Sequence, residues 1–171
     1  MGDGGPAPLL LISFDDPTVT YMLSGFGDEI GTIVADPTNP ANKVAKVDKP
    51  VTSPLWAGTT VSTMPNDQII TLPLSAMSTK MSVRAWSPTA NIKVLLKVED
   101  ANDPTHSCET LATVTAAGAW QTLDFDFANE APGTAKLNPA FTFNRVSIFF
   151  NFGVDGATAG AQTYYFDDVT F

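Results

Sequence analysis

Short segments in which apolar and polar residues alternate, each followed by a turn sequence, most strongly limit what this chain can fold into. Residues 93–99 carry Val94, Leu96 and Val98 at every second position, and residues 120–127 repeat the pattern. Side chains of a β-strand point alternately to opposite faces, so this spacing predicts strands that bury one face. With 12 Gly, 13 Pro and only 16% charged residues, the chain lacks long runs of helix-forming residues. We therefore expect an all-β fold, an antiparallel β-sandwich (jelly roll) of two packed sheets.

The length of 171 residues fits a single domain with a sizeable core. Residues 1–8 are rich in Gly and Pro and are interpreted as a flexible lead or linker, and residues 9–171 as one β-sandwich. The lead lacks the apolar stretch of a signal peptide, so we expect any targeting segment to have been removed. The pattern predicts strands over residues 9–15, 19–23, 44–47, 56–62, 68–74, 81–86, 93–99, 107–115, 120–127, 145–152 and 163–171, with a loop over residues 36–42.

Acidic residues outnumber basic ones by 18 to 9, which gives a formal net charge of -9. Proteins that bind nucleic acid or anionic membrane surfaces need a basic surface, so neither is an expected partner. No apolar run reaches the about 18 residues that would insert into a membrane as a helix. One cysteine cannot form an internal disulfide, and one histidine with one cysteine cannot build the usual zinc site. His106 is the only histidine available for nucleophilic catalysis, so we expect a protein that is not an enzyme.

Acidic residues also stand at both ends of the predicted sandwich. Asp15 ends the first predicted strand, and Asp167 lies in the last one. Terminal strands of a sandwich often pair, which would bring these carboxylates together, and they repel each other unless a cation or a proton separates them. Ca²⁺ takes about six to eight oxygen ligands, and Asp48 and Asn42 could supply further oxygens. These four residues are a candidate structural calcium site, and a solvated acidic strand end is the alternative.

A second group of residues is polar and aromatic, and the alternation directs it away from the core. If the strands over residues 81–86, 93–99, 107–115 and 145–152 are neighbours, one sheet face carries Arg84, Trp86, Lys97, Glu99, Glu109, Phe149 and Asn151. Aromatic rings stack on the C–H faces of sugars, and charged or amide groups bind hydroxyls, so this mixture suits a sugar. Lys97 and Glu109 stand opposite each other about the turn and predict a cross-strand ion pair. The alternative is that a loop covers the rings and the charges only pair.

Two further tryptophans lie outside this group. Trp56, between Leu55 and Ala57, either lines the rim of a cleft or plugs the sandwich, and it is counted with the candidate binding residues. Trp120 leads into a predicted strand and is expected to fill the core or its edge.

Several stretches resemble one group of bacterial proteins. They are Met-Ser-Val-Arg-Ala-Trp-Ser-Pro (81–88), Lys-Val-Leu-Leu-Lys-Val-Glu-Asp (93–100), Gly-Ala-Trp-Gln-Thr-Leu-Asp-Phe-Asp-Phe (118–127) and Tyr-Tyr-Phe-Asp-Asp-Val (164–169). The chain resembles galactose-binding-like jelly-roll carbohydrate-binding modules, of the type attached to secreted laminarinases of marine bacteria, over nearly all of residues 10–171.

This resemblance implies a β-sandwich with a structural Ca²⁺ near the paired termini, for which Asp15 and Asp167 match the typical ligands. It implies a non-catalytic, monomeric module of a larger protein that is secreted or held at the bacterial cell surface. The implied partner is a polysaccharide, with a β-1,3-glucan such as laminarin as the first choice. Two other functions stay open: a small jelly-roll polysaccharide lyase or glycosidase, and a structural spacer without a ligand.

Overall fold

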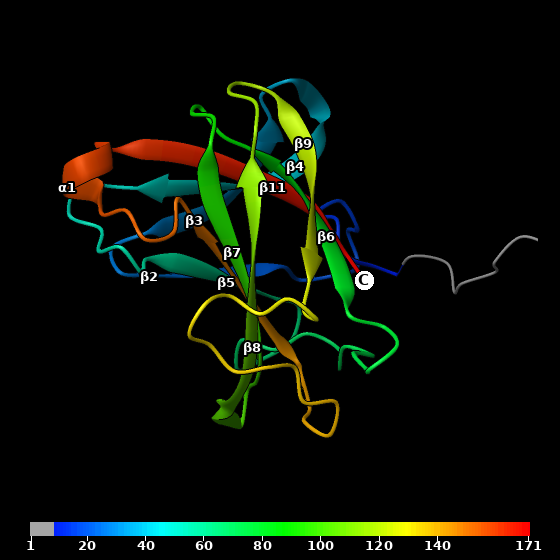
Figure 1. Ribbon diagram of the computed structural model, residues 1–171. Coiled ribbons are helices and arrows are strands. Elements are labelled where there is room, and N and C mark those ends of the chain that lie inside the picture. Colours follow the sequence, from blue (N-terminus) through cyan, green and yellow to red (C-terminus); the bar gives the residue numbers. More distant parts are fainter. Residues whose placement is uncertain (1–8) are drawn as a thin grey trace, which may run out of the picture.

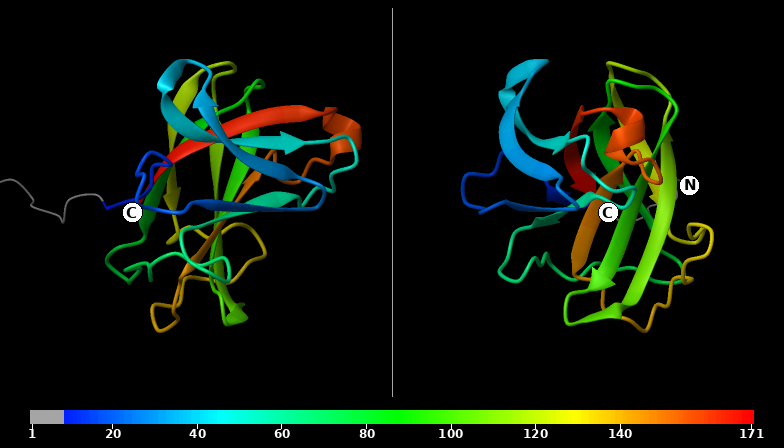
Figure 2. Two further views of the ribbon diagram at one scale, coloured as in Figure 1. Left: turned by 180° about the vertical axis from the view of Figure 1, so that it is seen from behind. Right: turned by 90° about the vertical axis from the view of Figure 1, so that its left-hand side faces the viewer.

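The computed structural model describes residues 9–171, which fold into two antiparallel sheets packed face to face (Figures 1 and 2). The six-stranded sheet has the order β3-β4-β11-β6-β9, with β1 also beside β11, and the five-stranded sheet has the order β2-β5-β10-β7-β8. The elements are β1 (Leu10–Ile12), β2 (Met22–Phe26), β3 (Ile30–Asp36), β4 (Asn39–Lys49), β5 (Gly58–Ser62), β6 (Lys80–Trp86), β7 (Ile92–Asp100), β8 (Asp103–Val114), β9 (Trp120–Asp126), β10 (Arg145–Phe150), α1 (Gly156–Ala159) and β11 (Gln162–Thr170). The predicted all-β antiparallel β-sandwich is confirmed.

The alternation along the strands produces the core between the two sheets. Every second residue of β7 from Val94 to Val98 is at most 1% exposed and belongs to the main core cluster. The rings of Phe150 in β10 and Tyr164 in β11 stack across the two sheets, with centroids 4.8 Å apart. Burial of each large apolar side chain contributes about 1.5–3 kcal/mol to stability, so these contacts hold the layers together.

The hairpin of β3 and β4 differs from the sequence-based expectation. Residues 30–36 form an edge strand whose side chains are mostly exposed, so they carry no alternation of buried and exposed positions. Residues 36–42, predicted as a loop, are the tight end of this hairpin. The Oδ1 atom of Asp36 accepts hydrogen bonds from the backbone N–H (2.8 Å) and the hydroxyl (2.7 Å) of Thr38, which closes the turn.

Residues 68–74, predicted as a strand, form an irregular segment. Ile69 and Leu72 are buried as the apolar pattern predicts. Their backbone N–H groups donate to the carbonyls of Asn144 and Phe143, both at 2.8 Å, rather than to a neighbouring strand of a sheet. The apolar pattern therefore identified the burial correctly and the hydrogen bonding wrongly.

The two ends of the described chain lie side by side, as expected for terminal strands. β1 pairs antiparallel with β11, with Leu10 opposite Thr170, and Leu9 and Phe171 exchange two backbone hydrogen bonds of 2.8 Å (Figure 1). The interpretation of residues 1–8 as a flexible lead lies outside the described residues. α1 is four residues long, and no helix within residues 9–171 has the length and apolar character to cross a membrane.

Candidate functional site

A cleft of about 460 Å³ lies on the outer face of the five-stranded sheet. Its floor consists of the side chains that alternate with the core residues of β5, β7 and β10. Loops before β5 and after β10 contribute Trp56 and Phe152 to its wall. Because the strands are in register, the outward side chains form rows that cross the sheet, and the rows differ in chemistry.

The first row is aromatic and apolar. Phe149 of β10 stands opposite Leu95 of β7, and Phe26 of β2 stands opposite Gly58 of β5. The rings of Phe26 and Phe149 meet edge to face with centroids 5.4 Å apart. A Cβ atom on Gly58 would lie 2.7 Å from the Phe26 ring and 2.8 Å from the Phe149 ring, so only glycine lets these rings close over β5.

The second row is polar and crosses all five strands. The strand pairings align Ser24, Thr60, Ser147, Lys97 and Glu109 from β2 to β8. The hydroxyls of Thr60 and Ser147 hydrogen-bond to each other at 2.7 Å. Hydroxyl, ammonium and carboxylate groups thus lie in one line beside the aromatic row.

In the third row Glu99 of β7 stands opposite Arg145 of β10. Glu99 is the acid that binds both basic groups of the cleft. Glu99, 8% exposed, lies 2.8 Å from Lys97 Nζ through Oε2 and 3.4 Å from Arg145 Nη1 through Oε1. Arg145 also donates to the backbone carbonyls of Asn66 (2.9 Å) and Asp67 (3.3 Å). Both cations of the cleft are therefore held by Glu99.

The predicted ion pair between Lys97 and Glu109 does not form. The two residues stand opposite each other in the β7–β8 register as expected, but Lys97 turns along its own strand to Glu99. Within residues 9–171, the Glu109 carboxylate has no ion-pair partner, so it stays available as a hydrogen-bond acceptor at the cleft.

The structure brings together five of the eight predicted binding residues. The five that line the cleft are Trp56, Lys97, Glu99, Glu109 and Phe149. Trp56 is 53% exposed, so of its two expected positions it takes the one at the cleft rim.

Three predicted binding residues lie elsewhere. Arg84 and Trp86 belong to β6, which pairs with β9 and β11 in the six-stranded sheet and not with β7. Of the four strands assumed to be neighbours, β7, β8 and β10 do lie side by side, and only the placement of β6 was wrong. Asn151 follows β10 with a φ of 47°, a left-handed conformation that ends the alternation and turns its side chain toward buried Tyr164.

Other residues that line the cleft were not among the predicted binding residues. The sequence pattern indicates some of them and not others. Arg145 and Ser147 share the outward side of β10 with Phe149, so the period of two already indicated them. Phe26 and Asp67 lie in Gly-rich and turn-rich stretches without alternation, and only the folded chain shows that they reach the cleft.

The candidate calcium ligands Asp15 and Asp167 approach consecutive residues of β4. The Asn42 amide donates to Asp167 Oδ2 (2.8 Å), and the backbone N–H of Lys43 donates to Asp15 Oδ1 (2.9 Å). Asp167 is 1% exposed, and its Oδ1 atom has no hydrogen-bond partner. Burial raises the pKa of Asp167 to about 6, although the Asn42 bond and the charge of Arg84 act in the opposite direction.

Asp48 does not join this group. It follows Asn42 by six positions on the same extended strand, which is about 20 Å at ~3.3 Å per residue. There its carboxylate binds Lys46 Nζ (2.7 Å) and the hydroxyl of Thr163 (2.6 Å). In the described part of the chain, no three His, Cys, Asp or Glu side chains gather as a metal site.

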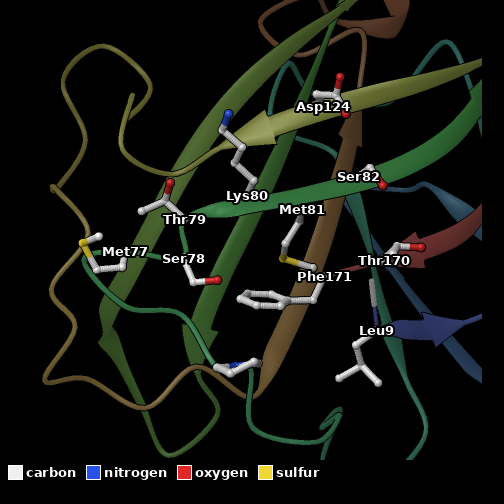
Figure 3. A pocket seen from close by; sticks show the side chains of 11 residues that line it. Leu9, Met77, Ser78, Thr79, Lys80, Met81, Ser82, Asp124, Thr170 and Phe171 are labelled. Atoms are coloured by element: carbon white, nitrogen blue, oxygen red, sulfur yellow. The ribbon is translucent and has the colours of Figure 1, made fainter. Parts of the chain in front are cut away.

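A larger hollow, of about 880 Å³, lies beside the two ends of the described residues (Figure 3). Met77, Met81, Leu9 and Phe171 surround it, and among residues 9–171 Phe171 is the only aromatic residue of its lining. It lacks the rows of aromatic and polar groups seen in the cleft, so we place the candidate site on the five-stranded sheet. His106 is stacked on Phe141 with ring centroids 3.7 Å apart and is not part of the cleft lining.

No family model and no curated protein matches this sequence. Solved structures do match its fold. A family 11 carbohydrate-binding module from Clostridium thermocellum, in complex with a β-1,3-1,4-mixed-linked tetrasaccharide, has a TM-score of 0.57 at 10% identity, covering 95% of this chain and 94% of that one. A mutant family 29 carbohydrate-binding module complexed with mannohexaose has a TM-score of 0.54 at 10% identity, covering 95% and 89%.

The CBM22-2 xylan-binding domain from Paenibacillus barcinonensis Xyn10C has a TM-score of 0.54 at 16% identity, covering 92% of this chain and 94% of that one. The fold of this chain is therefore the β-sandwich of carbohydrate-binding modules. This is the fold that the sequence resemblance implied.

Proposed function

We propose that the cleft of the five-stranded sheet binds a polysaccharide chain without cleaving it. The observation that carries this proposal is the register of the sheet, which sets an aromatic row beside a row of hydroxyls and charged groups across the strands. Aromatic faces bind the C–H surfaces of sugar rings, and the polar row matches their hydroxyls. The rows are formed by strands, so the site is largely preformed.

The charges of the cleft support a neutral ligand. Lys97 and Arg145 both pair with Glu99, and Glu109 and Asp67 add two further carboxylates, so the acids of the cleft outnumber its bases. An anionic polysaccharide would meet excess negative charge, whereas a neutral glycan finds hydroxyl partners. The β-glucan bound by the family 11 neighbour supports β-glucan as the ligand class, with laminarin as the first candidate.

The binding test is isothermal titration calorimetry, combined with affinity electrophoresis, against laminarin, mixed-linked β-glucan, xylan, mannan and alginate. We expect laminarin or mixed-linked β-glucan to bind with a dissociation constant between about 1 μM and 1 mM, a range that corresponds to about 8 to 4 kcal/mol. Trp56→Ala is expected to weaken binding at least tenfold, because the exposed ring at the rim is lost.

Leu55→Ala is the matched control, since Leu55 is similarly exposed (49%) but does not line the cleft. Absence of binding to every glycan of the panel would contradict the proposal. Release of new reducing ends or unsaturated products from the same panel would instead support the lyase or glycosidase alternative.

We also propose a stabilising Ca²⁺ between Asp15 and Asp167. The buried, unpaired Oδ1 of Asp167 and the proximity of both carboxylates to consecutive residues of β4 support it. Carbonyl oxygens would complete the ligand set, since Ca²⁺ accepts them readily. A ligand that binds only the folded state, at 100 times its dissociation constant, adds about 2.7 kcal/mol to stability.

Thermal unfolding in CaCl₂ and in EGTA tests the calcium site. We expect a higher melting temperature with Ca²⁺ in the wild type and in Asp48→Asn, and a smaller difference in Asp15→Asn. Equal melting temperatures of the wild type in both buffers would contradict the proposed calcium site.

The net charge of -9 supports a further proposal, that this chain acts as a module of a secreted or surface-attached bacterial protein.

A further inference from the structure

Three aromatic side chains form a row on the outer face of the six-stranded sheet, on the side of the molecule away from the cleft. Trp86 of β6 stands opposite Tyr165 of β11 and opposite Trp120 of β9. The rings of Trp86 and Tyr165 meet edge to face at 5.5 Å, and those of Trp120 and Tyr165 lie 6.5 Å apart. All three are partly exposed, unlike the fully buried rings of the core.

These rings line a cavity of about 120 Å³, and Pro37 and Thr38 at the tip of the β3–β4 hairpin close one side of it. The hairpin tip lies beside β9 at the top of the molecule in Figure 1. An apolar cavity of about 150 Å³ can hold a benzene molecule, and this cavity is of similar size. That is space for one compact ring and not for a stretch of polysaccharide.

Polar contacts fix the wall of this pocket to its floor. The indole Nε1 of Trp120 donates to the hydroxyl of Thr38 (3.1 Å) and to Asp36 Oδ1 (3.3 Å). The guanidinium of Arg84 lies over the Trp120 ring, 4.1 Å from its centroid, and is 3.6 Å from Asp36 and 3.4 Å from Asp167. The pocket is thus held open by a connected network and does not depend on a ligand for its shape.

The same contacts decide the chemistry of an occupant. One face of Trp120 already carries the Arg84 cation, which disfavours a second cation, and the two buried carboxylates disfavour an anion. A neutral sugar ring meets both conditions, because its C–H faces can pack on the indole rings and its hydroxyls can form hydrogen bonds at the rim. Thr38 is exposed at the rim, and its hydroxyl, which donates to Asp36 and accepts from Trp120, keeps one lone pair to accept a hydrogen bond from an occupant.

We propose that this pocket is a second binding site, which takes a single neutral sugar ring such as the end of a glycan chain. It goes beyond the cleft, which binds the interior of a chain and lies on the other sheet. The two sites share no residue.

The three tryptophans of the chain allow both sites to be followed at once, because Trp56 lines the cleft and Trp86 and Trp120 line the pocket. The indole N–H signals are recorded by two-dimensional ¹H–¹⁵N NMR and assigned with single Trp→Phe variants. The probes are methyl β-D-glucopyranoside, methyl β-D-galactopyranoside and methyl α-D-mannopyranoside. We expect at least one probe to give saturable shifts of the Trp86 and Trp120 signals.

Two variants make the result specific. Trp56→Ala is expected to leave the shifts of Trp86 and Trp120 unchanged, whether or not the cleft binds a polysaccharide. Thr38→Val keeps the size of an exposed side chain, removes its hydroxyl and is expected to weaken the pocket at least threefold, with no effect on the Trp56 signal. Trp86→Ala is not needed, so a failure of that variant to fold does not affect the test.

The proposal is overturned if none of the three glycosides shifts the Trp86 and Trp120 signals. It is also overturned if their shifts disappear in Trp56→Ala, because the signals would then report the cleft. Failure of laminarin to bind the cleft, with the pocket shifts intact, would contradict the function proposed for the cleft alone.

Discussion

Glu29, at the turn between β2 and β3, makes the stability of this fold depend on pH. Its side chain is 4% exposed; Oε1 accepts a hydrogen bond from the Thr59 hydroxyl (2.7 Å), and Oε2 is buried without a partner. Burial raises the pKa of Glu29 from 4.5 to about 7, although the Thr59 bond and the charge of Lys49 oppose the rise. The folded state therefore binds this proton more tightly than the unfolded state does.

The sign of the effect follows from that difference. Because the pKa of Glu29 is higher in the folded protein, its contribution to stability is fully present below about pH 4.5 and is lost as the pH rises to about 7. The complete loss for a rise from 4.5 to about 7 is about 3 kcal/mol, at 1.36 kcal/mol per pKa unit. Between pH 5 and pH 8 the linkage relation gives about 2–3 kcal/mol, a large share of the ~5–15 kcal/mol of a typical domain.

The perturbation is Glu29→Gln, which keeps the acceptor for Thr59 and removes the titration. Urea unfolding at pH 5 and pH 8 measures the free energy of unfolding of the wild type and of the variant. We expect the wild type to lose about 2–3 kcal/mol more than Glu29→Gln between these pH values. All other titrating groups are common to both proteins, so they cancel in this comparison.

Asp28→Asn is the matched control, because it removes one negative charge at the neighbouring exposed position. It should keep the pH dependence of the wild type. If the wild type and Glu29→Gln lose the same free energy between pH 5 and pH 8, Glu29 is ionised in the folded protein throughout this range and the reasoning fails.

Three further predictions concern the cleft and its support. Gly58→Ala forces apart the two rings that cover β5, so we expect at least tenfold weaker laminarin binding by calorimetry and a loss of about 1–3 kcal/mol in urea unfolding. Lys49→Met removes the buried ammonium that donates to the backbone carbonyls of Phe150, at the end of β10 (3.0 Å), and of Val154 (3.1 Å), and should lower the free energy of unfolding by about 2–4 kcal/mol at pH 7. Glu99→Gln leaves Lys97 and Arg145 without their acid, and should create binding to alginate that weakens with added salt in affinity electrophoresis.

The parts of the site that the sequence predicted are those fixed by local pairing. Lys97, Glu99 and Glu109 belong to one hairpin, where the alternation and the short turn together determine which side chains share a face. That they point to the same side of the sheet followed from the period of two. The ion pairs did not follow, because Arg145 reaches Glu99 only through the pairing of β10 with β7.

The position of β6 could not be predicted in the same way. Alternation shows which side chains of a strand face away from the core, and it placed Arg84 and Trp86 outward correctly. It does not show which of the two sheets a strand joins, because that depends on pairing with β11, about 80 residues later in the chain. The sequence therefore did not separate the outer faces of the two sheets. The position of the loop that carries Trp56 also depends on the complete fold.

The separation of these two outward faces changes what the aromatic residues mean for function. Exposed aromatic surface is apolar area that a protein usually covers or uses, and each of the two outer faces carries some of it. Here the rows lie on opposite sheets, one in a larger cleft and one in a smaller pocket. A polysaccharide interior in the cleft and a chain end in the pocket cannot belong to the same short oligosaccharide. If both sites bind as proposed, a module on an insoluble glycan is held at two places, and its binding gains from the high local concentration of the second site.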